Sequence, residues 1–133
     1  MRIIILFFLS FCMLMACKSN KKMADFTSDQ AAIESLAKEK YKGPFVIFPS
    51  EKHDYSLVTS RTKTLKMLFP TVHFFVYDHK TDKILIEDDL IGGSVRWTTT
   101  HEIEATRRGQ GTDLKNGRHS YVYNCRTNEW FEE

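Results

Sequence analysis

A ten-residue pattern occurs twice in this chain, and it constrains the fold more than any other feature. Residues 75–84 (FVYDHKTDKI) and 121–130 (YVYNCRTNEW) share one order of residue types: aromatic, Val, Tyr, Asp or Asn, any residue, Lys or Arg, Thr, Asp or Asn, charged, large apolar. The first Asp or Asn of each copy can accept backbone amides of a turn, and the second tolerates a left-handed backbone. Each copy therefore predicts a β-hairpin.

The spacing of the two copies and their strand–turn–strand form are similar to the blades of a β-propeller, which repeat every 40 to 50 residues or so. Only two copies fit in this chain, whereas a closed propeller needs at least about four blades. A meander that uses the same hairpin chemistry twice explains the repeat better.

One helix is expected before the strands. Thr27 to Gln30 fit a capping box with Thr27 as N-cap, and Phe26 can pack against Ala31. Apolar residues then follow at helical spacing up to Tyr41, and Gly43-Pro44 ends the pattern.

After Pro44 the pattern becomes that of strands. They are expected at residues 45–48, 55–60, 72–77, 83–87, 95–97, 103–105, 119–125 and 130–131. Residues 64–69 alternate and predict a strand or a helical turn, whereas 107–117 carry three glycines and predict a loop. Residues 72–77 are bulky on both faces, which indicates a central, covered strand. The fold class is therefore α+β: one N-terminal helix packed on an antiparallel β-meander sheet of about six to eight short strands.

The first residues resemble a lipoprotein signal. Arg2 precedes an apolar run, residues 3–15, of signal-peptide length that is too short for a typical membrane-spanning helix. The run closes on Leu14-Met15-Ala16-Cys17, which resembles the lipobox of bacterial lipoproteins. The resemblance implies cleavage before Cys17 and attachment of acyl chains such as palmitate to that cysteine, which anchors the protein in a lipid bilayer.

This resemblance divides the chain into three parts: a signal peptide at 1–16, the lipidated cysteine and a tether at 17–25, and a single α+β domain at 26–133. It also implies an address in the bacterial cell envelope. Lys18 is not the aspartate that retains enterobacterial lipoproteins at the inner membrane, so the outer membrane is favoured. The periplasmic and surface faces both stay open.

Charge and cysteine content exclude further classes. Lys and Arg total 19 against 17 Asp and Glu, and removal of Arg2 leaves the mature chain close to neutral, so a nucleic-acid partner is not expected. Of three cysteines, Cys12 leaves with the signal and Cys17 is acylated, so Cys125 has no partner for a disulfide. No histidine spacing suits a metal, and no cofactor motif occurs.

The candidate contact residues for a ligand or partner are Arg107, Arg108, Trp97 and Trp130. The two arginines lie in the predicted glycine-containing loop and can clamp an anionic group. The tryptophans belong to an aromatic set on the late strands and would form a binding hot spot if they were exposed beside the arginines. The leading hypothesis is a non-enzymatic envelope lipoprotein that binds a protein or a glycan.

Two alternatives remain open. One is a small envelope hydrolase or other enzyme with a polar cleft built from Glu87, Asp88, His101 and the Arg107–Arg108 segment. The other is an inhibitor or immunity lipoprotein, which this size suits. A Cys125–His119 nucleophile is not favoured, because six residues of one strand separate them by roughly 20 Å; Cys125 is expected in the core or a turn.

Overall fold

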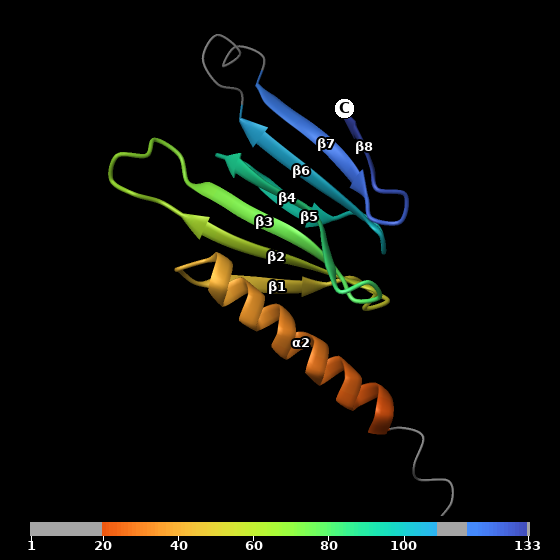
Figure 1. Cartoon of the computed structure of the whole chain (residues 1–133). Coiled ribbons are helices and arrows are strands. Elements are labelled where there is room, and N and C mark those ends of the chain that lie inside the picture. Colours follow the sequence, from red (N-terminus) through yellow and green to blue (C-terminus); the bar gives the residue numbers. More distant parts are fainter. Residues whose placement is uncertain (1–19, 109–116, 133) are drawn as a thin grey trace, which may run out of the picture. The chain divides into compact units, whose positions relative to one another are not determined.

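The structure, a computed structural model, describes residues 20–108 and 117–132 (Figure 1). The chain divides into two compact units, Met1–Leu36 and Ala37–Glu133. The signal peptide, Cys17 and most of the loop predicted at 107–117 lie outside the described residues.

The helix α2 spans Asn20–Lys40 and starts well before Thr27, so the start predicted from the capping box is wrong. Residues 20–24, expected in the tether, are helical, because nothing in Lys-Lys-Met-Ala breaks a helix and all four are good helix formers. The end is as predicted: the Tyr41 amide donates to the Ala37 carbonyl, and Gly43-Pro44 follow. No helix within the described residues is long and apolar enough to cross a membrane.

The unit Ala37–Glu133 contains two four-stranded antiparallel sheets. Sheet A has the order β1 (Phe45–Pro49), β2 (Tyr55–Thr62), β3 (Thr71–Asp78) and β4 (Lys83–Ile91). Sheet B has the order β5 (Ser94–Trp97), β6 (Glu102–Arg108), β7 (Arg118–Asn124) and β8 (Glu129–Glu132). The α+β class and the antiparallel meander pairing are confirmed, but the single sheet is wrong, because each group of four strands forms its own sheet.

The split occurs at Gly92-Gly93, between β4 and β5. Gly92 has a φ of 59°, a left-handed value that favours glycine, and its amide donates to the Pro70 carbonyl over 2.8 Å. A Cβ atom at Gly93 would overlap the carbonyl oxygen of Thr106 in β6. The chain thus passes directly against β6 instead of turning back along β4, and it starts a second sheet.

The two sheets bury a common core. Alternating side chains of β3 point to the same side of sheet A, and they meet side chains of β6, of β7 and of the turn after β7. The buried members of this cluster are Leu57, Val72, Phe74, Val76, Leu90, Ile103, Ala105, Tyr123 and Cys125. The sheets therefore pack face to face.

The other face of sheet A is covered as well. Val58 and Phe75 on this face are fully buried, and the ring of Tyr41 stacks on Phe75 with centroids 5.9 Å apart. Ala37, in the last turn of α2, is also fully buried. The prediction that residues 72–77 form a central strand covered on both sides is confirmed.

The repeated motif forms two hairpins with matching contacts. The carboxylate of Asp78 accepts the Lys80 amide (2.8 Å), and the side-chain oxygen of Asn124 accepts the Arg126 amide (2.9 Å). The second acidic or amide position is left-handed in both, with φ 53° at Asp82 and 57° at Asn128. These two side chains each accept a tyrosine hydroxyl, from Tyr77 over 3.2 Å and from Tyr123 over 2.9 Å. The hairpin prediction is confirmed in both copies.

Three segments differ from the sequence-based expectation. Residues 64–69 are neither strand nor helix but a loop with a turn in which the Met67 amide donates to the Thr64 carbonyl. The side chains of Leu65, Met67 and Leu68 are exposed to solvent. Arg107 and Arg108 lie in β6 rather than in a loop, paired with His119 and Arg118. The acidic run 87–89 lies within β4 rather than beyond a strand end, because β4 continues to Ile91 and pairs with β3 throughout.

Candidate functional site

A cavity of about 810 Å³ lies on the outer face of sheet A, against the end of α2. We call it the outer cavity. It is lined by Lys40, Tyr41, Lys42, Gly43, Ser60, Arg61, Thr62, Lys63, His73, Phe74, Glu87, Asp88 and Asp89. Its volume is in the range of small-molecule sites, and its lining is mostly polar.

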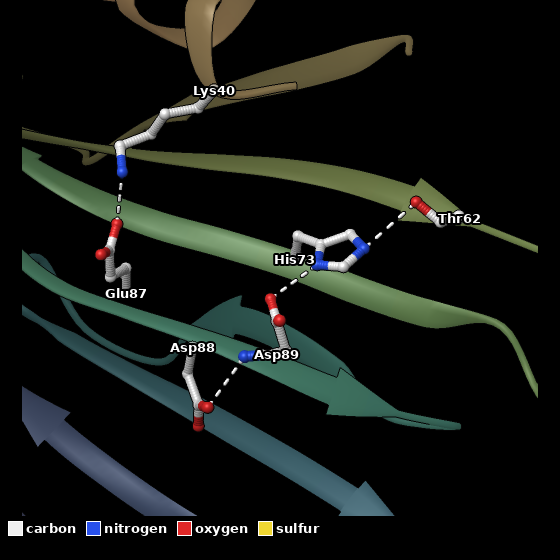
Figure 2. Close-up of polar contacts among 6 residues, drawn as sticks. All are labelled: Lys40, Thr62, His73, Glu87, Asp88 and Asp89. Carbon is white, nitrogen blue, oxygen red and sulfur yellow. Dashed lines mark hydrogen bonds and ion pairs between the residues drawn. The ribbon is translucent and has the colours of Figure 1, made fainter. Parts of the chain in front are cut away.

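A chain of three polar side chains crosses this cavity. His73 Nδ1 lies 2.6 Å from Asp89 Oδ1, and His73 Nε2 lies 3.1 Å from Thr62 Oγ1 (Figure 2). One tautomer satisfies both contacts: Nδ1–H donates to the carboxylate, and Nε2 accepts the threonine hydroxyl. The same order of carboxylate, imidazole and hydroxyl activates nucleophiles in hydrolases.

Register brings these residues together. His73 in β3 is directly opposite Asp89 in β4, and Phe75 is opposite Glu87. Side chains alternate between the two faces of a strand, so Glu87 and Asp89 share the outer face whereas Asp88 points the other way. The acidic side chains are thereby divided between the two faces of β4.

An ion pair closes one side of the outer cavity. Lys40 Nζ lies 2.6 Å from Glu87 Oε2, with 32% and 60% of the two side chains exposed (Figure 2). Burial, followed by the charges of Glu87 and Asp89, raises the pKa of Tyr41 far above its usual value. Tyr41 is therefore a neutral phenol at any physiological pH.

A second, smaller groove of about 230 Å³ lies where the edge of β4 meets sheet B. We call it the Trp130 groove. Its lining residues are Ile86, Glu87, Asp88, Arg107, Tyr121, Trp130 and Glu132. Here the structure assembles two of the predicted contact residues, Arg107 and Trp130, with two residues of the enzymatic alternative, Glu87 and Asp88.

Tyr121 is fixed at the base of the Trp130 groove. Its hydroxyl donates to Asp88 Oδ2 over 2.8 Å, and its ring meets Trp130 edge to face with centroids 6.5 Å apart. Burial and the hydrogen bond to Asp88 raise the pKa of Tyr121 well above its usual value. Trp130 itself stays 60% exposed, so the groove presents a large aromatic surface beside charged groups.

The other predicted residues lie elsewhere. The Arg108 guanidinium stacks on the Phe69 ring at 4.2 Å, and Trp97 Nε1 donates to the Phe48 carbonyl over 2.9 Å, so both hold parts of the fold together. His101 lines a separate pocket with Arg126. The cleft imagined from Glu87, Asp88, His101 and Arg107 does not form as one site.

Cys125 is buried directly after β7, and its amide donates to the His101 carbonyl over 2.8 Å. Burial raises the pKa of its thiol to about 12. His119 lies toward the opposite end of β7. The prediction of a core or turn cysteine is confirmed.

Sequence reasoning missed His73, Asp89 and Thr62 as members of one site. His73 falls in the strand predicted at 72–77, which is expected to be covered, and the strand predicted at 83–87 ends before Asp89. Asp89 lies beside β3 because β4 continues past Glu87, and no pattern in the sequence reveals this continuation. Among the residues that the structure describes, no group of three or more His, Cys, Asp or Glu side chains is placed to hold a metal ion.

Comparison with known proteins gives no relative for this chain. No family model matches it, no curated protein is similar to it, and no solved structure resembles it. The function is therefore argued from the geometry of the two sites and from the sequence.

Proposed function

We propose that this chain is a lipid-anchored protein of the bacterial cell envelope that works as a non-enzymatic binding module. The support for the anchor is the apolar run that ends in Leu14-Met15-Ala16-Cys17, with Cys17 as the acylated residue. Lys18 favours the outer membrane. The ligand is another protein, bound through the Trp130 groove, with a glycan as the alternative ligand.

The observation that carries the binding proposal is the position of Trp130. This side chain is 60% exposed in a groove that also contains Arg107 and Tyr121. Trp, Tyr and Arg are the residues most enriched at energetic hot spots of protein interfaces. Tyr121 is already held by Asp88, so binding costs little further ordering of that side chain. An inhibitor or immunity lipoprotein would be one form of such a module.

The anchor is tested by the fate of Cys17. We expect intact-mass analysis of the native product to show a chain that starts at Cys17 and carries acyl chains, and fractionation to place it with membranes. Cys17→Ser should abolish the acylation and release the protein from the membrane fraction. A native product without an acyl group would end this part of the proposal.

The groove is tested by capture of a partner from detergent-solubilised envelopes. We expect a stoichiometric protein to bind the native chain and to be lost with Trp130→Ala or Arg107→Ala. Phe131→Ala is the matched control, because Phe131 is 57% exposed on the same strand but pairs with Val122 on the opposite face of sheet B. Equal capture by the native chain and the Trp130 variant would contradict the proposal.

The Asp89–His73–Thr62 chain favours a second candidate function, an acyl hydrolase. Thr62 Oγ1 would attack an ester carbonyl while His73 Nε2 takes its proton, with Asp89 stabilising the imidazolium. His73 would pass that proton to the departing alcohol as the ester C–O bond breaks, and water would then hydrolyse the acyl-Thr62 ester. A fluorophosphonate probe should then modify Thr62, and His73→Gln should prevent the modification. The Ser56–His79 contact of 2.9 Å is the matched control, since Ser56 is buried and should stay unmodified. Absence of an adduct at Thr62 would remove this candidate.

A further inference from the structure

The loop between β2 and β3, residues 63–70 (KTLKMLFP), presents large apolar side chains to solvent. Leu65 is 108% exposed, Leu68 84% and Met67 40%. A single exposed leucine on a protein surface is ordinary, but adjacent apolar side chains at a loop tip mark a surface that is covered by something else.

This loop has a defined conformation. The Met67 amide donates to the Thr64 carbonyl over 3.0 Å, which forms a turn at the tip. The far end is held by two contacts: the Pro70 carbonyl accepts the Gly92 amide over 2.8 Å, and the Phe69 ring lies under the Arg108 guanidinium. Leu65 and Leu68 therefore project from a loop that is held in place by hydrogen bonds and by the Phe69–Arg108 contact. Their exposure to solvent follows from this conformation.

Charge indicates what covers the loop. Arg61, Lys63 and Lys66 lie in or next to it, and residues 61–70 contain no acidic side chain. This local excess of positive charge contrasts with the near-neutral chain as a whole. Apolar side chains flanked by lysines and arginines suit the interface of an anionic bilayer, where the apolar groups enter the acyl region and the cationic groups stay among the lipid headgroups.

We propose that residues 63–70 insert into the surface of an anionic lipid bilayer and form a second membrane contact of this protein. The choice of a bilayer as the occupant rests in part on the proposed anchor at Cys17, which would hold the chain at a membrane. The loop lies at the end of sheet A away from the β1–β2 and β3–β4 turns (Figure 1). Its insertion would orient sheet A with this end toward the lipid and with those turns away from it.

Insertion is tested with the mature chain, residues 17–133, carrying Cys17→Ser so that no acyl chain is present. An environment-sensitive fluorophore is attached at Leu65→Cys, or at Thr81→Cys in the β3–β4 turn as the matched control; Cys125 is buried and is not labelled. On addition of phosphatidylethanolamine–phosphatidylglycerol vesicles we expect a blue shift and an intensity increase at position 65. The same probe at position 81 should stay unchanged.

The apolar and basic contributions are separated by cosedimentation with the same vesicles. Leu65→Ser and Leu68→Ser should each weaken partitioning about tenfold. Val46→Ser is the control, because Val46 is a 53% exposed apolar side chain of β1 outside the loop, and it should leave partitioning unchanged. Lys63→Gln with Lys66→Gln should weaken binding to anionic vesicles but not to vesicles of neutral lipid.

Two results would overturn the proposal: no spectral change at position 65, or an equal change at positions 65 and 81. Capture of a protein that depends on Leu65, without vesicle binding, would likewise overturn it and assign the loop to a protein partner. Because the tested chain lacks Cys17, failure of the acyl anchor in the native product and failure of loop insertion are separate outcomes.

Discussion

The two hairpins that share the ten-residue motif have the same turn geometry but differ in how deeply their strands are buried. β3 and β4 are joined by a turn in which Asp82 is left-handed, and β7 and β8 by one in which Asn128 is left-handed, with the same tyrosine contact. Yet β3 is covered on both faces, whereas all of β8 is exposed. The turn residues thus determine the local geometry and leave burial undetermined.

Burial is decided by residues outside the motif. β4 and β8 are each the last strand of their sheet, but β4 continues for nine residues and contributes Leu90 to the core, whereas β8 has four residues, all exposed. Tyr41, from a segment far away in sequence, covers Phe75 in the first hairpin. In sheet B, the equivalent outer positions carry polar residues such as Glu104 and Thr106. In both sheets the hairpin forms the third and fourth strands, so β4 and β8 are both edge strands. The two copies therefore differ in burial through strand length and covering residues, not through their place in the sheet.

The largest difference in the free energy of unfolding is expected between alanine variants of two phenylalanines, one in each hairpin. Phe74 is 1% exposed between the sheets, and Phe74→Ala should lower the free energy of unfolding by about 3–5 kcal/mol. Phe131 is 57% exposed in β8, and Phe131→Ala should cost less than about 1 kcal/mol. Urea unfolding of both variants measures the difference. Similar losses would mean that β8 is covered in solution.

Alanine substitutions in the two turns should lower the free energy of unfolding by similar amounts, although the strands next to the turns differ in burial. Asp82→Ala and Asn128→Ala each place an alanine in a left-handed conformation and remove a hydrogen bond from a tyrosine hydroxyl. We expect each to lower the free energy of unfolding by about 1–2 kcal/mol. Urea unfolding gives both values. A clear loss for one variant alone would show that the two hairpins are not energetically equivalent.

A smaller, pH-dependent effect should come in part from Cys125 in the turn of the second hairpin, alongside the partly buried phenols of Tyr41 and Tyr121. Burial raises the pKa of its thiol from an ordinary 9.0 to about 12, so the folded state holds its proton more tightly than the unfolded state. The resulting stabilisation is complete below pH 9.0 and is lost as the pH rises toward about 12. Urea midpoints between these values should fall less steeply for Cys125→Ala. If the urea midpoint of Cys125→Ala fell with pH as steeply as that of the native chain, the raised pKa of the Cys125 thiol would be contradicted.

The smallest effect is expected at the ion pair between the end of α2 and sheet A. Both side chains of the Lys40–Glu87 pair are substantially exposed, so Lys40→Met should lower the free energy of unfolding by at most about 1 kcal/mol. The difference from the native chain should shrink further in high salt. A larger loss would indicate that Lys40 does more than cover the outer face of sheet A.

The fold could be predicted from the sequence wherever local chemistry decides it. Asp78, Asp82, Asn124 and Asn128 specified both turns, and the bulky residues of β3 indicated a strand covered on both sides. The division into two sheets was missed, because it depends on how closely Gly93 approaches β6, which is a contact between residues distant in sequence. Residues 64–69 form a loop and not the expected strand or helical turn. Alternation of apolar residues does not reveal that Leu65, Met67 and Leu68 face solvent.

The candidate sites were predicted only in part, for a related reason. Arg107 and Trp130 were selected from their residue types, and the structure brings them into one groove. Trp97 and Arg108 have the same residue types but make contacts within the fold. The contact of His73 with Asp89 depends on strand register, which no short-range pattern in this sequence specifies.

The last strand has a further consequence for association between copies of this chain. Trp130 and Phe131 lie exposed at the edge of sheet B between Glu129 and Glu132. An exposed apolar edge can recruit the same edge of another molecule and nucleate fibrils, and flanking carboxylates oppose this by mutual repulsion. Neutralising both glutamates would therefore promote self-aggregation of the native fold without altering its core.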